Sequence, residues 1–116
     1  MTSKNIEEFL NFLRQCEQEY SMAQADYQDT NDETQDILHS LELESHTYHE
    51  YANLSKRLAE VRKRRRQAKD KIAVMEPIVC FCEENKAFIK STERLLGDVR
   101  KAEKKLENRV YTPRKK

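Results

Sequence analysis

The stretch that decides the fold is residues 54–75, which read LSKRLAEVRKRRRQAKDKIAVM. Contact positions recur along it in alternating steps of three and four, as they do on the seam of a coiled coil. The same spacing extends back to residue 34. The full seam is Thr34, Ile37, Leu41, Glu44, Tyr48, Tyr51, Ser55, Leu58, Val61, Arg65, Ala68, Ile72 and Met75. This spacing predicts long amphipathic helices that pack side by side.

The composition of the whole chain agrees with long helices. Its 116 residues include one glycine, two prolines and no tryptophan, and 37% of them are charged. Few residues therefore interrupt a helix, but the apolar core of a lone chain is thin. We expect one all-α domain over residues 1–110, an elongated antiparallel helical hairpin or a three-helix coiled-coil bundle. The thin core also leads us to expect a homo-oligomer or a partner surface.

Three local signals place the expected helix boundaries. The sequence Thr30-Asn31-Asp32-Glu33 has the capping-box pattern, so we favour a break there, although a continuous helix through 29–33 stays open. Pro77 suits the first position of a new helix, which predicts a hairpin turn near it. Gly97 indicates a close approach of two helices. The expected helices span about 3–29, 31–75 and 77–110, and the basic tail 111–116 is expected to be flexible.

Charge is divided unequally between the two halves of the chain. Residues 1–50 carry two bases and twelve acids, whereas residues 51–116 carry twenty bases and nine acids. Opposite charges of this size either attract one another within the fold or face separate partners. We favour internal attraction, with 100–105 lying beside 42–51 in a hairpin that turns at Pro77.

The strongest candidate site is a run of basic residues in the middle of the seam. Five consecutive bases cover every side of a helix, so some must face outward, and arginine forks match phosphate and carboxylate oxygens. The run serves either as a docking surface or as a set of pairs for the acidic half. The candidate partner- or phosphate-binding residues are Lys56, Arg57, Arg62, Lys63, Arg64, Arg65, Arg66 and Lys69.

Enzyme chemistry is not expected from these residues. His46 and His49 lie three apart with Glu42 and Glu50 nearby, but a metal site needs further ligands from another helix, so a solvated face is favoured. Cys80 and Cys82 are two apart and fit apolar packing better than zinc binding. We expect no catalytic residues, no metal and no cofactor.

The sequence also bears on location. Residues 1–5 lack the apolar run of a secretory signal, and no stretch has the roughly 20 apolar residues that span a bilayer. Three cysteines, an odd number, fit a reducing compartment. We expect a cytoplasmic protein with no membrane contact.

Four short segments carry a resemblance to a known group of proteins. Ser45–Tyr51 with Leu58–Arg66, and the ending Leu95–Glu103 with Asn108–Arg114, resemble small helical proteins of phages and prophages of low-GC Gram-positive bacteria. The resemblance assigns no chemistry to any residue. It implies an accessory protein that binds and modulates or inhibits a host protein or nucleoprotein, with anti-defence proteins such as anti-CRISPR proteins as the favoured version.

Two other functions stay open from the sequence. One is a nucleic-acid-binding accessory protein that uses Arg62, Arg64, Arg65 and Arg66 on phosphates. The other is a structural coiled coil in particle assembly. Salt-dependent binding to arbitrary DNA or RNA would indicate the first of these, and large self-assemblies would indicate the second.

Overall fold

Three helices make up the computed structural model, which describes residues 1–109. They are α1 (Thr2–Leu43), α2 (Tyr48–Glu84) and α3 (Lys86–Glu107), and no strand occurs within this range. The expected all-α, elongated architecture is confirmed. The expected tail 111–116 and the last residue of the expected third helix lie outside the described residues. None of the three helices is long and apolar enough to pass through a bilayer.

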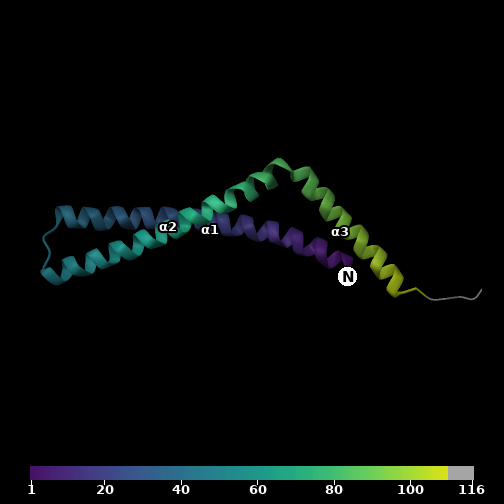
Figure 1. Cartoon of the computed structure of the whole chain (residues 1–116), viewed down its shortest axis with the longest axis horizontal. Helices are drawn as coiled ribbons and strands as arrows, with labels where there is room; N and C mark the ends of the chain where they lie inside the picture. The colour runs from purple at the N-terminus through teal and green to yellow at the C-terminus, as the bar shows by residue number, and fades with distance from the viewer. Residues whose placement is uncertain (110–116) are drawn as a thin grey trace, which may run out of the picture.

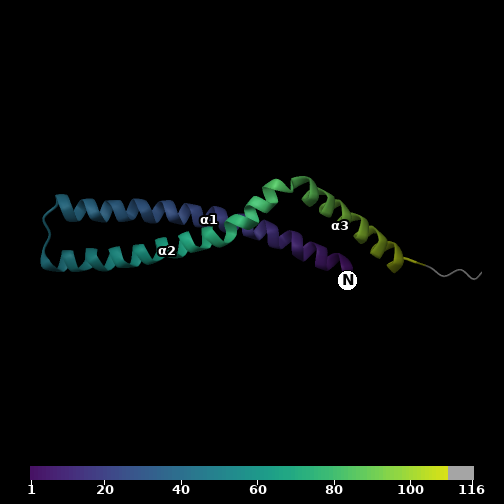
Figure 2. The ribbon, with the colours of Figure 1, turned by 45° about the horizontal axis from the view of Figure 1, so that its top comes forward.

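The helices form a thin rod with a bend near one end. α1 and α2 run antiparallel and pack side by side over much of their length (Figures 1 and 2). We call this two-helix part, residues 20–43 and 48–72, the arm. Beyond the arm, α2 crosses α1 at an angle, with Cys82 near its end still close to Glu17 of α1, and the chain then bends into α3, which returns toward the N-terminus of α1 (Figure 1). The molecule measures 97 × 29 × 15 Å. Every helix therefore leaves most of its surface uncovered.

The core is a single line of mostly small or aliphatic side chains along the helix contacts. Thr30 is the most deeply buried residue, at 0% exposed, and it lies in the middle of the α1 seam. The buried apolar residues are Leu10, Leu13, Cys16, Ala23, Ile37, Val61, Ala68, Cys82 and Leu96. In α1, residues 16, 23, 30 and 37 are seven apart, which is the heptad spacing of a coiled-coil contact.

The favoured break at 29–33 is wrong, because α1 is continuous from Thr2 to Leu43. The Thr30 hydroxyl donates to the carbonyl oxygens of Asp26 at 2.8 Å and Tyr27 at 3.0 Å. The hydrogen-bonding capacity of the hydroxyl is therefore satisfied by backbone carbonyls of the same helix, as happens when a threonine side chain is buried away from water. A capping threonine would instead have accepted a bond from the backbone of a new helix.

The hairpin turn lies at residues 44–47, inside the helix expected over 31–75, and not near Pro77. Thr47 has an extended backbone and its hydroxyl accepts the Glu50 N–H at 3.3 Å. Thr47 and Glu50 are three residues apart, so this is a second sequence with the capping-box spacing. The seam that spans residues 34 to 75 is consequently divided between two antiparallel helices.

Pro77 lies inside α2, so the boundary expected there is also wrong. A proline removes the N–H that would bond to the carbonyl of Ala73, and both residues are exposed, so water can satisfy that carbonyl. The helix ends at Glu84 instead, with Asn85 as its C-cap. The Asn85 backbone N–H and side-chain Nδ2 both donate to the Phe81 carbonyl oxygen, at 3.0 and 2.9 Å.

α3 packs against the first turns of α1. Arg100 pairs with Glu7 at 2.9 Å, and the Ser3 N–H donates to Glu103 at 3.4 Å. The Ser3 side chain first, and then its backbone N–H, lower the pKa of Glu103. The expectation that 100–105 lies beside 42–51 is therefore wrong, because it depended on a turn at Pro77. The close approach expected at Gly97 is also wrong, since no atom lies within 4 Å of the place a Cβ would occupy.

Candidate functional site

Arg65 is the one member of the basic run that points into the helix contact. Its Nε donates to Asn31 Oδ1 at 2.6 Å and its NH2 donates to the Tyr27 hydroxyl at 3.2 Å. The guanidinium also lies 5.2 Å from the centre of the Tyr27 ring. The Asn31 hydrogen bond and the Arg65 charge together lower the pKa of Tyr27. Arg65 therefore links α2 to α1 and is not free to bind a partner.

Arg57 and Arg64 are exposed, but both reach Glu33 of α1. Arg57 Nη2 lies 3.4 Å from one Glu33 carboxylate oxygen, and Arg64 Nη1 lies 3.8 Å from the other. Pairs as exposed as these contribute at most about 1 kcal/mol. They orient the two arginines without removing them from solvent.

The other five candidates are exposed, and none makes an ion pair with a residue in 1–109: Lys56, Arg62, Lys63, Arg66 and Lys69. Arg62 and Lys69 are seven apart and Arg66 lies between them, so these three share one side of α2. We call Arg62, Arg66 and Lys69 the basic face. Lys56 and Lys63, also seven apart, form an outer ridge beside it.

A shallow groove of about 680 Å³ runs between the two helices next to the basic face. Its lining combines side-chain amides and hydroxyls from α1 with arginines from α2, and Leu38 at its edge is 41% exposed. The lining residues are Gln28, Asn31, Asp32, Thr34, Gln35, Leu38, Arg62 and Arg65. This side of the arm offers hydrogen-bond donors and positive charge to an incoming molecule.

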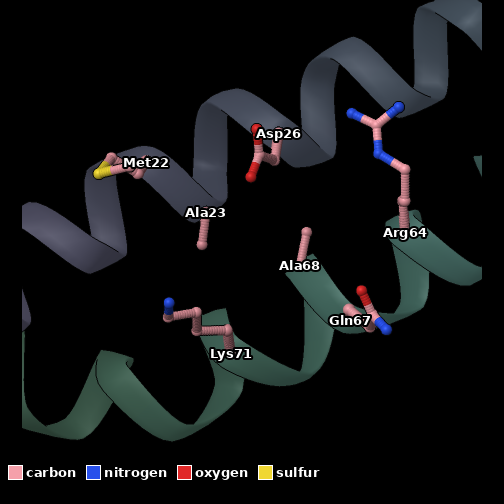
Figure 3. Close-up of a pocket in the computed structure, with 7 residues that line it drawn as sticks. All are labelled: Met22, Ala23, Asp26, Arg64, Gln67, Ala68 and Lys71. Carbon is pink, nitrogen blue, oxygen red and sulfur yellow. The ribbon is translucent and has the colours of Figure 1, made fainter.

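A second groove, of about 280 Å³, lies on the opposite side of the arm. Arg64 lines this groove and Arg62 lines the first one, and residues two apart face different sides of a helix. Ala23 and Ala68 point toward one another across its floor, and charged side chains surround them (Figure 3). Heptad spacing adds further charges to the same side. We call this side the dipolar face; its charged residues are Asp26, Asp29, Glu33 and Asp36 of α1 and Arg57, Glu60, Arg64 and Lys71 of α2.

The arm as a whole has opposite charge on its two helices. Residues 20–43 of α1 carry six acids and no lysine or arginine, net −6, and residues 48–72 of α2 carry nine bases and three acids, net +6. The expected attraction between the halves is present, but within the described residues only Glu33 of the six acids makes an ion pair across the arm. Most of these charges therefore face solvent.

His46 fastens the hairpin turn. Its Nε2 lies 3.0 Å from the Ser40 carbonyl oxygen, and its Nδ1 lies 3.1 Å from the Glu50 carboxylate, with Glu44 at 4.0 Å and the Tyr51 ring edge-on. The Ser40 carbonyl first, and then Glu50, raise the pKa of His46, because both ring nitrogens face acceptors. No group of three possible metal ligands occurs in residues 1–109.

This arrangement predicts pH-dependent stability of the turn. A raised pKa in the folded state gives stabilisation that is fully present below about pH 6.5 and is lost as the pH rises through the folded pKa. We expect the difference in unfolding free energy between wild type and His46→Gln to shrink when the pH is raised from about 6 to about 9. Thermal unfolding of both proteins across that range measures the difference, and a constant difference would contradict the expectation.

Two buried thiols, Cys16 and Cys82, have a pKa raised by burial, which keeps them protonated, whereas Cys80 is exposed. The packing expected for Cys82 is thus present, but Cys80 does not share it.

The candidates predicted from the sequence include the bases but not the groups that give each face its character. The groups missed are Lys71, Glu60, the four α1 acids of the dipolar face and the α1 amides. Their seven-residue spacing was the available signal, but it needs the hairpin turn to be placed correctly.

Comparison of the chain with protein-family models, with curated proteins and with solved structures gave no match.

Proposed function

We propose that this protein is a non-enzymatic helical interaction module that binds an acidic surface of another protein through its basic face. The observation that carries the proposal is the exposure of Arg62, Arg66 and Lys69, without ion-pair partners in residues 1–109, beside an amide-lined groove. The resemblance noted above supports a narrower version, in which a phage or prophage protein inhibits a host protein or nucleoprotein as an anti-defence factor.

The geometry of the basic face suits docking. Arg62 and Lys69 stand about 10 Å apart along a straight helix, and Lys56 extends the positive charge to about 20 Å. Arginine binds carboxylates with two parallel hydrogen bonds, and the groove amides can pair with the backbone of a partner. Leu38 adds an apolar contact at the rim.

A protein partner fits this surface better than a nucleic acid does. The acidic helix α1 lies directly beside the basic face, and Asp32 is part of the groove itself. A continuous run of phosphates along the arm would meet that acidic helix, which carries −6 over residues 20–43. A protein can place acids opposite α2 and neutral or apolar groups opposite α1.

Charge reversal on the basic face tests the proposal. The tagged protein captures its partner from a lysate of a low-GC Gram-positive bacterium, mass spectrometry identifies it, and titration with the purified partner gives the dissociation constant. We expect Arg62→Glu, Arg66→Glu and Lys69→Glu together to weaken binding about 100-fold, since each lost charge contact contributes about 1 kcal/mol.

A matched control makes the same change of charge on α3, at Lys101, Lys104 and Lys105, which are exposed and lie away from the arm. The control should bind within about threefold of wild type. Equal loss in both variants would contradict a specific basic face. Tight, salt-dependent binding to arbitrary duplex DNA or RNA would replace the proposal with nucleic-acid binding.

A further inference from the structure

The dipolar face, which the proposed function does not use, points to a second copy of this chain as its occupant. We propose that two arms pack through their dipolar faces around a two-fold axis parallel to the arm. The two hairpin turns then lie at the same end, and α1 of each copy lies against α2 of the other. The result is a four-helix arrangement that leaves both basic faces on the outside.

Charge complementarity is the first argument. Among the charged residues of this face, α1 presents four acids and α2 presents three bases and one acid, Glu60, in two parallel rows of opposite net charge. The internal pairs engage Glu33 with Arg57 and Arg64, but Asp26, Asp29 and Lys71 have no ion-pair partner in residues 1–109. A row of acids beside a row of bases is self-complementary, as a two-fold interface requires.

The same rows select the direction of the two-fold axis. Rotation about an axis parallel to the arm exchanges the two rows, so that the acids of one copy lie over the bases of the other. Rotation about an axis that crosses the arm in the plane of the face would place α1 over α1. Acids would then face acids, and like charges at an interface are strongly unfavourable.

Packing on the dipolar face supports the same occupant. The floor of its groove is formed by the small side chains of Ala23 and Ala68, while Met22 at its rim is 67% exposed (Figure 3). An unbranched methionine adapts to irregular hollows. Met22 and the groove lie on the same face, so each copy can insert its Met22 into the groove of the other.

The total surface of the chain gives the third argument. It exposes 9637 Å², whereas a compact chain of its length exposes roughly 6,700 Å². In the arm, each helix has only one neighbour. α3 does not obstruct the dipolar face, since its ion pairs with α1 are at Glu7 and Arg14, both before residue 22. Pairing of two arms covers a second side of each helix.

Complementary charge reversals test the proposal. Sedimentation equilibrium at low salt should show the wild type as a dimer. We expect Arg64→Glu with Lys71→Glu, and separately Asp26→Lys with Asp29→Lys, to weaken self-association about 100-fold, because each replaces four attractive contacts per dimer by repulsive ones. Mixing the two variants should restore a dimer, since at the reversed positions acids of one variant then face bases of the other.

The matched control is Arg62→Glu with Lys69→Glu, which makes the same change of charge at the same spacing on the basic face and should leave the dimer intact. Circular dichroism verifies that every variant keeps its helices. A wild type that stays monomeric at the highest soluble concentration would overturn the proposal. So would a dimer that tolerates both reversals, or two variants that fail to associate when mixed.

Discussion

Replacing Ile37 by alanine should lower the free energy of unfolding by about 3 kcal/mol, whereas the same replacement at the adjacent Leu38 should lower it by less than about 1 kcal/mol. Ile37 is 2% exposed and lies on the α1 seam beside α2, while Leu38 is 41% exposed at a groove edge. The truncation of Ile37 removes buried apolar area and leaves a cavity. The truncation of Leu38 removes less buried apolar area, because much of this side chain is already exposed to water.

Chemical denaturation at a fixed protein concentration measures both values, and the fixed concentration matters because self-association adds to the apparent stability. The neighbouring substitution is an internal control, since the two residues differ by one position and have the same helix environment. Equal losses at Ile37 and Leu38 would contradict the contact between α1 and α2 described above. A larger loss at Leu38 would mean that its groove is covered in solution.

The seam containing Ile37 was predictable from sequence, whereas the turn that closes the arm was not. Thr30 and Thr47 are both followed by glutamate three residues later, so each matches a helix start. The distinction is their place in the heptad. Thr30 falls in register with Cys16, Ala23 and Ile37 and is buried, whereas Thr47 lies off the seam and its hydroxyl is free to cap α2.

The candidate site was predictable in the same partial way. The basic run identified which residues carry the charge, but a helical wheel alone does not say which of them meets α1. Arg65 points inward because residues 27 and 31 lie opposite it, and that pairing follows from a turn at 44–47. A turn at Pro77 would have paired α2 with α3 and given every base a different neighbour.

The contact face of α3 is another feature that the 3-4 spacing of the sequence leaves open. Phe88 and Leu95 follow that spacing but are 55% and 51% exposed, whereas Leu96 at 9% is buried. The spacing is satisfied by both sets, because 89, 92, 96 and 99 follow it as closely as 88, 92, 95 and 99 do. Only the bend at Asn85 decides which set turns toward α1.

Leu96→Ala should therefore destabilise the docking of α3 by about 2 to 3 kcal/mol, and Leu95→Ala by less than about 1 kcal/mol. α3 contacts the rest of the molecule along one narrow line, so the loss should appear first as faster amide hydrogen exchange in α3 while the arm stays protected. Hydrogen exchange with mass spectrometry separates the two regions within one experiment.

A larger effect at Leu95 than at Leu96 would contradict this contact, because Leu95 and Phe88, seven residues apart on α3, form a heptad row that is exposed. A larger effect of Leu95→Ala would mean that this row is the contact and that α3 has rotated about its axis. Exchange that rises uniformly along α1, α2 and α3 after Leu96→Ala would instead show one cooperative unit, in which the line from Leu96 to α1 stabilises the arm as well.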